Sequence, residues 1–127
     1  MNQRTILLTG IVFAGMAVAV GAFGAHALRS LLEENARTET YELAVRYQFY
    51  HAFAILFSGV LMTHFPSRHL NRAAICFAAG ILIFSGSLYI LSLSGLRALG
   101  AITPVGGVLF IAGWVLLFLG INAKRSG

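Results

Sequence analysis

The sequence predicts an all-α protein, a bundle of four transmembrane helices that run antiparallel and are joined by short loops. Two observations predict this class. Four long apolar runs fill most of the 127 residues, and each is close to the roughly 20 residues that a helix needs to cross about 30 Å of hydrocarbon. Asp, Glu, Lys and Arg are also absent from four stretches, residues 6–25, 47–63, 73–96 and 98–121.

The composition predicts one membrane domain over residues 1–127. The chain is 58% hydrophobic and 10% charged, whereas soluble domains carry about 25% charged residues. The net charge is +5, but the basic residues stand singly between apolar runs, which argues against a nucleic-acid-binding surface. The lone Cys76 has no partner for a disulfide or a zinc site. We expect helices at about residues 5–28, 39–64, 70–93 and 104–122.

The first helix carries small residues along one face. They recur at spacings of four, three, four and three, at Gly10, Ala14, Ala17, Gly21 and Gly24. Small residues allow helix backbones to approach closely in lipid, so this stripe favours helix packing over a ligand cavity.

The end of the first helix also resembles a signal-peptide cleavage site, at Ala25-His26-Ala27. The apolar stretch of about 20 residues is longer than the 7–15 of a signal peptide. We therefore expect an uncleaved helix. In the polar loop that follows, Ser30 and Glu33 have the spacing of a capping box, which predicts a short surface helix.

The second helix is predicted to begin with Thr38 as its N-cap and to stop before Pro66, which cannot continue the backbone ladder. A helix over residues 39–64 is about 39 Å long at 1.5 Å per residue. Its first two turns should therefore project from the hydrocarbon. Glu42 and Arg46 are four residues apart there, a spacing that permits an ion pair.

In the third helix, Ser85 and Ser87 are expected to bond either their own backbone or a neighbouring helix. Thr103 and Pro104 have the pattern of an N-cap followed by proline at the first helical position. The fourth helix then repeats glycine every seven residues, at Gly106, Gly113 and Gly120. This second small-residue stripe predicts close packing.

The basic residues predict that both termini are cytoplasmic, in a multi-pass protein of the bacterial inner membrane. With four spans, one side holds five basic residues and no acid, namely Arg4, Arg68, Arg72, Lys124 and Arg125. The other side holds all four glutamates and four basic residues, Arg29, Arg37, Arg46 and Arg97. Cytoplasmic loops carry the excess of Lys and Arg.

Four local sequences resemble a known family when taken in order. They are GAFGAHAL (21–28), YQFYHAFAIL (47–56), GILIFSGSLYIL (80–91) and ITPVGGVLFIAGW (102–114). Together they resemble the YgdD-like family of small bacterial inner-membrane proteins. The resemblance covers essentially the whole chain and implies a four-helix membrane protein without an established biochemical function. It carries no catalytic or ligand residues.

Polar residues in or near the spans form one candidate site. The predicted topology brings the end of the first helix, the start of the second and the start of the fourth to one side, which allows a cluster of His26, Tyr47, Gln48, His51 and Thr103. Polar groups within a membrane often mark functional paths, but hydrogen bonds between helices or to lipid headgroups are the favoured explanation for these residues. Two histidines give too few ligands for a metal, so we expect neither a metal nor another cofactor.

Two classes of function remain open at this stage. The first is a structural or interaction component of the membrane, which contacts the lipid bilayer and assembles as a homo-oligomer or on a larger membrane complex. The alternative is an oligomeric transporter or channel for a small solute or proton that uses the His26/His51 cluster. An enzyme is not expected, because no nucleophile elbow, phosphate-binding loop or paired catalytic carboxylates occur.

Overall fold

A computed structural model describes residues 1–123 of the chain, and every regular element within them is a helix. Two predicted topology residues, Lys124 and Arg125, lie outside the described residues. The elements are α1 (Gln3–Ala25), α2 (Arg29–Glu34), α3 (Thr38–Leu61), α4 (Arg68–Gly80), the π-helical turn η1 (Ile81–Ser85), α5 (Gly86–Ser94), the 3₁₀-helix η2 (Arg97–Ala101) and α6 (Thr103–Asn122).

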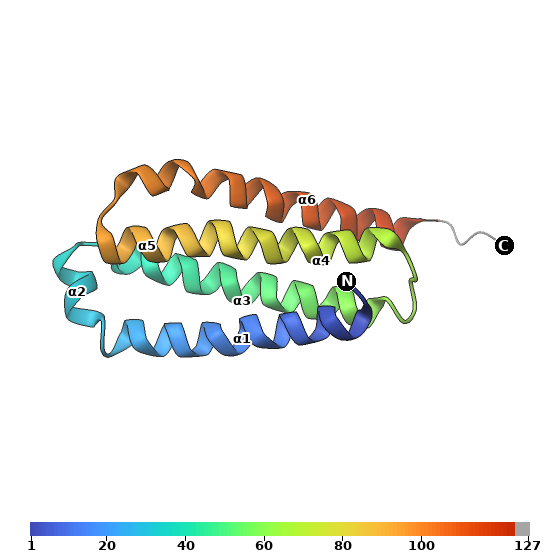
Figure 1. Ribbon diagram of the computed structural model, residues 1–127, viewed down its shortest axis with the longest axis horizontal. Helices are drawn as coiled ribbons and strands as arrows, with labels where there is room; N and C mark the ends of the chain where they lie inside the picture. Colours follow the sequence, from blue (N-terminus) through green and yellow to red (C-terminus); the bar gives the residue numbers. More distant parts are fainter. Residues whose placement is uncertain (124–127) are drawn as a thin grey trace.

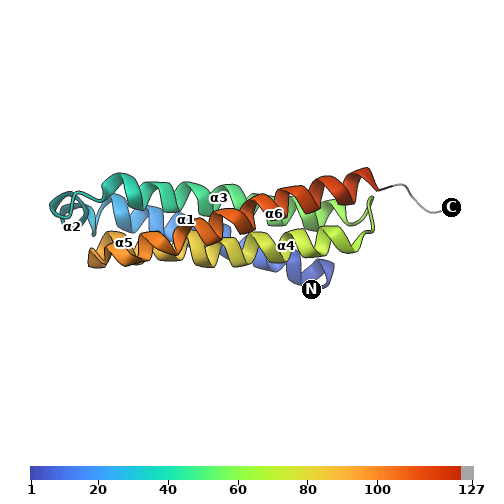
Figure 2. The same cartoon turned by 90° about the horizontal axis from the view of Figure 1, so that it is seen from above.

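The long helices lie side by side in chain order (Figure 1). α1 packs against α3, α3 packs against the continuous rod of α4, η1 and α5, and α6 packs against the other side of that rod. α1 and α6 therefore occupy opposite edges of the molecule. Figure 2 shows α6 crossing the rod obliquely. The start of α1 and the end of α6 lie at one end of the molecule, and α2 lies at the other.

Within residues 1–123, three helical stretches are long and apolar enough to cross a membrane: Gln3–Ala25, Arg68–Ser94 and Arg97–Asn122. α3 is also 24 residues long, but Arg46, Gln48 and His51 lower its hydropathy. These three long apolar helices are those of an all-helical membrane protein. The helix α3, which the sequence predicted as the second of four spans, thus differs from the other three in being partly polar.

Several helix ends differ from the prediction by a residue or more. The short helix α2 exists, but Leu28 is its N-cap and makes no side-chain cap, so the predicted capping box of Ser30 and Glu33 is wrong. Thr38 and Thr103 are the first residues of α3 and α6 rather than their caps. Side-chain caps form instead at Asn2, which accepts from Thr5 N at 2.8 Å, and at Ser67, which caps α4. Short polar residues at these positions satisfy backbone N–H groups that have no helical partner.

The turn between α2 and α3 places Ala36 in the left-handed region, with φ of 54°. Its N–H donates to Glu33 O at 3.1 Å, and the N–H of Arg37 donates to Leu32 O at 2.9 Å. These two bonds form the Schellman ending of a helix, where glycine is the usual residue at the left-handed position. Alanine is strained there, because its Cβ crowds the following carbonyl.

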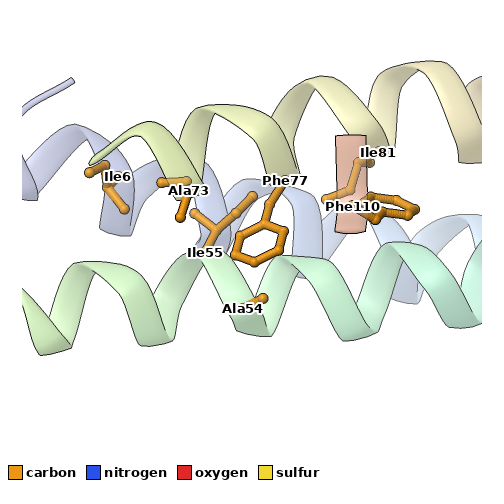
Figure 3. Packing of buried hydrophobic residues seen from close by; sticks show 8 residues of the cluster. Ile6, Ala54, Ile55, Ala73, Phe77, Ile81 and Phe110 are labelled. Carbon is orange, nitrogen blue, oxygen red and sulfur yellow. The ribbon is translucent and has the colours of Figure 1, made fainter. Parts of the chain in front are cut away.

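The apolar core lies between α1, α3, α4 and α6. Phe77 is fully buried within it, in one cluster with Ile6 and Ile55. Figure 3 shows Ile55 next to Phe77, with Ile6 toward one side and Ile81 and Phe110 toward the other. Each of these helices buries part of its surface in this core. The opposite faces of α1 and α6 carry many exposed apolar side chains, as expected of helices that contact lipid.

Glycines set the spacing of α6 against the α4–α5 rod. A Cβ at Gly106 would collide with the backbone and Cβ of Phe84, one at Gly113 would lie 2.6 Å from the Phe77 ring, and one at Gly120 would lie 3.2 Å from Leu70. All three glycines are buried. Close backbone approach is therefore required along this interface.

The stripe on α1 faces α3 and is less completely covered. Gly10 and Ala17 are buried, whereas Ala14, Gly21 and Gly24 are partly exposed. A Cβ at Gly10 would lie 2.7 Å from Leu56, and one at Gly24 would overlap the ring of Tyr41.

Candidate functional site

His51 is the most buried ionisable residue of the predicted cluster. It lies in the middle of α3 with 5% of its surface exposed. Its Nδ1 lies 2.8 Å from Tyr47 O, and its Nε2 accepts a hydrogen bond of 3.1 Å from Trp114 Nε1 on α6. A carbonyl only accepts and an indole N–H only donates, so these partners assign the neutral tautomer with its proton on Nδ1. Both ring nitrogens are satisfied by protein.

Aromatic rings surround this histidine. The ring of Phe110 stacks on it at 3.6 Å between centroids, with the planes only 8° apart. Trp114 meets Phe77 edge to face at 4.9 Å, and Tyr47 stacks on Phe84 at 4.8 Å. Each such pair contributes about 0.5–1.5 kcal/mol beyond its buried area. This aromatic layer joins α3, η1, α4 and α6, and it consists of Tyr47, His51, Phe77, Phe84, Phe110 and Trp114. The helices α3 and α6 do not share one of the larger helix–helix interfaces of the described residues.

Gln48 connects α3 to two other helices. Its Nε2 donates to Phe13 O on α1 at 2.8 Å, and its Oε1 accepts from the Tyr89 hydroxyl on α5 at 2.6 Å. The ring of Tyr89 lies 5.3 Å from that of Tyr41, whose hydroxyl donates to Val20 O on α1 at 2.5 Å. The buried amide therefore has partners at both ends.

Two serines of the α4–α5 rod make further hydrogen bonds between helices. Ser85 Oγ donates to Ala44 O on α3 at 2.8 Å. Ser87 Oγ and Thr103 Oγ1 lie 2.7 Å apart and share a hydrogen bond between α5 and the start of α6. Thr103 thus bonds Ser87 rather than a histidine.

The structure does not bring the five predicted site residues into one cluster. His26 is exposed at the C-cap of α1. Gln48 bonds α1 at Phe13, which lies 13 residues before His26, or about 20 Å away along the helix. The prediction that His26 and His51 share a site at one end of the molecule is therefore wrong. Tyr47 and His51 both lie in the aromatic layer. Gln48 and Thr103 instead make separate hydrogen bonds, Gln48 to Phe13 and Tyr89 and Thr103 to Ser87.

Sequence reasoning missed Trp114 and Tyr89 as partners of these residues. It expected Ser85 and Ser87 to bond their own backbone or a neighbouring helix, as they do, but did not pair Ser87 with Thr103. An indole N–H within the hydrocarbon region needs an acceptor from the protein, and this signal could have singled out Trp114. The missing information was the rotation of each helix about its axis. No group of three His, Cys, Asp or Glu among residues 1–123 could hold a metal.

A groove of about 520 Å³ separates α3 from α6 beside the aromatic layer. Its lining includes Tyr47, His51, Pro104, Gly107 and Trp114. The walls are mostly apolar, and the polar atoms of His51 and Trp114 are turned toward one another. The groove thus offers little beyond an apolar surface to a ligand.

Comparisons with known proteins agree with this picture. The family described as "Protein of unknown function (DUF423)" matches residues 20–107. The chain is 44% identical over 117 residues to the UPF0382 membrane protein SAB0533 of Staphylococcus aureus, an alignment that covers 92% of this chain and 94% of the relative. It is 39% identical over 128 residues to the UPF0382 inner membrane protein YgdD of Escherichia coli K12, covering 100% of this chain and 97% of the relative. No solved structure matches the chain.

Proposed function

Because the chain belongs to the DUF423 family of membrane proteins, whose function is not established, we propose that it is a non-catalytic structural or interaction component of the bacterial inner membrane. In this role it contributes a rigid helical unit that contacts lipid and assembles with a second copy or with a larger membrane complex.

The proposal includes four antiparallel spans, with α3 added to the three apolar helices, and with both termini in the cytoplasm. Two observations support α3 as a span. It is about 36 Å long at 1.5 Å per residue, and its polar Gln48 and His51 are 3% and 5% exposed, so neighbouring helices cover them. Arg4, Arg68 and Arg72 support a cytoplasmic location for the end of the molecule at which α1 begins.

The pairing of polar groups between helices is the observation that carries the proposal. His51 with Trp114, Gln48 with Tyr89, and Ser87 with Thr103 each use their hydrogen-bonding atoms on another helix. A solute path requires polar groups that exchange partners with the passing solute. Groups that are already bonded in pairs stabilise a fixed helix arrangement instead.

Purification and reconstitution test the proposal together. The tagged chain, extracted in lipid nanodiscs without detergent, should appear either with a stoichiometric partner or as a discrete homo-oligomer. Liposomes containing the chain should keep an imposed pH gradient or potassium gradient as long as protein-free liposomes do. Dissipation of either gradient, whether by a monomer or by a homo-oligomer, would overturn the structural role in favour of transport.

A further inference from the structure

A pocket of about 290 Å³ lies between the end of α1 and the start of α3. Small residues of α1, Gly21, Gly24 and Ala25, form one wall, and Tyr41, Val45 and Leu32 are among the other lining residues. Two charged side chains, Glu42 and Arg46, complete the lining from α3. The pocket therefore combines an apolar wall with one acid and one base.

The expected ion pair between Glu42 and Arg46 does not form, which corrects the sequence prediction. Among residues 1–123 the only ion pair is Arg29 with Glu33, at 3.1 Å. Both pocket residues are exposed, and neither has a hydrogen-bond partner within that part of the chain. A cation and an anion one helical turn apart are thus both available to a ligand.

The two charges have a fixed order along the membrane normal. Gly21 and Arg46 line the pocket on the side of the spans, whereas Ala25 and Thr38 line it on the side of α2, where the helices end. Arg46 is consequently the deeper charge and Glu42 the shallower one. In a phospholipid headgroup the phosphate likewise lies deeper than the amine that is attached to it.

We propose that this pocket binds the headgroup of a phosphatidylethanolamine, with the lipid phosphate on Arg46 and its ammonium group on Glu42. An arginine fork matches phosphate oxygens, and a primary ammonium supplies three N–H donors to a carboxylate. Leu32 and Val45 in the lining offer an apolar surface to the lipid glycerol and the first carbons of an acyl chain. A choline headgroup lacks the N–H donors, and a phosphatidylglycerol headgroup lacks the cation.

Lipid titration of the purified full chain, followed by native mass spectrometry, tests the proposal. The wild type should bind phosphatidylethanolamine about fivefold more tightly than phosphatidylcholine or phosphatidylglycerol, a ratio that corresponds to about 1 kcal/mol. Arg46→Gln should weaken binding of all three lipids. Glu42→Gln should remove the preference for phosphatidylethanolamine, and Glu42→Lys should shift the preference to phosphatidylglycerol.

Two exposed residues on the same end of the molecule serve as matched controls. Arg97→Gln and Glu39→Gln remove the same charges outside the pocket and should leave the order of lipid affinities unchanged. Equal affinity of the wild type for the three lipids would overturn the proposal. So would a loss of affinity in Arg97→Gln as large as that in Arg46→Gln. The readout is independent of partners and of solute flux, so the proposed structural role can fail without affecting it.

Discussion

Two neighbouring glycines of α6 allow a direct measurement of how tightly this helix packs. Gly106 faces the rod, and an added Cβ there would lie 2.7 Å from Phe84 Cβ and 2.8 Å from Phe84 Cα, with the Phe84 N closer still. At Gly107 an added Cβ would meet nothing within 4 Å. The two substitutions therefore add the same methyl group to the same helix, once against backbone and once in open space.

The magnitude follows from these distances. Ordinary van der Waals contact begins at 3.4 Å, so Phe84 Cβ at 2.7 Å must recede by about 0.7 Å, and the closer Phe84 N by more than that, to accept Gly106→Ala. A gap of 0.5–1 Å loses a quarter to a half of each dispersion contact that it opens, and overpacking costs about 1–3 kcal/mol in general. Because the obstructing atoms belong to backbone and Cβ, no side-chain rotation relieves the collision. Gly107→Ala should instead be neutral or stabilise by up to about 1 kcal/mol through helix propensity.

Thermal unfolding in detergent, followed by circular dichroism, measures the difference. Gly106→Ala should lower the melting temperature by several degrees relative to Gly107→Ala. Both proteins should retain wild-type helix content at low temperature. Equal melting temperatures for the two variants would refute the conclusion that α6 and the rod are in backbone contact at this level.

Three further outcomes are expected. Trp114→Phe should keep the aromatic packing but leave His51 Nε2 without its donor, which should lower the free energy of unfolding by about 1–3 kcal/mol; an unchanged denaturation midpoint would contradict this role. Ala36→Gly should raise the melting temperature, because the left-handed turn with φ of 54° costs alanine about 1–2 kcal/mol that glycine does not lose; a lower melting temperature would count against the strained turn. A green fluorescent protein fused after residue 127 should fluoresce and an alkaline phosphatase fused there should be inactive, and the reverse pair of results would place the C-terminus outside the cytoplasm.

Apolar run lengths and breaker residues predicted the helices to within a few residues. An apolar run of about 20 residues favours one long helix, and Pro66 cannot continue a helical backbone that approaches it from the N-terminal side. The π-helical turn at residues 81–85 has no comparable local signal. The apolar run around it predicts one continuous helix.

The candidate site was harder to predict than the fold. Topology indicates which end of a helix lies near which other end, but it does not give depth. His26 terminates α1, whereas His51 lies 13 residues into α3, about 20 Å from its start. Burial of Gln48 and His51 also required knowledge of which face of α3 is covered. Residue type marked these side chains as unusual, and only the tertiary structure identified their partners.

The order of helix contacts has a consequence for biogenesis. Each long helix packs mainly on the one that precedes it in the chain: α3 on α1, the α4–α5 rod on α3, and α6 on the rod. No large interface joins the first helix to the last. During synthesis each long helix can therefore dock on the preceding one as soon as both have emerged, without waiting for a later segment to close a ring. A nascent chain that ends after Ser94 already contains α1, α3 and the α4–α5 rod. These three can therefore pack together before α6 leaves the ribosome.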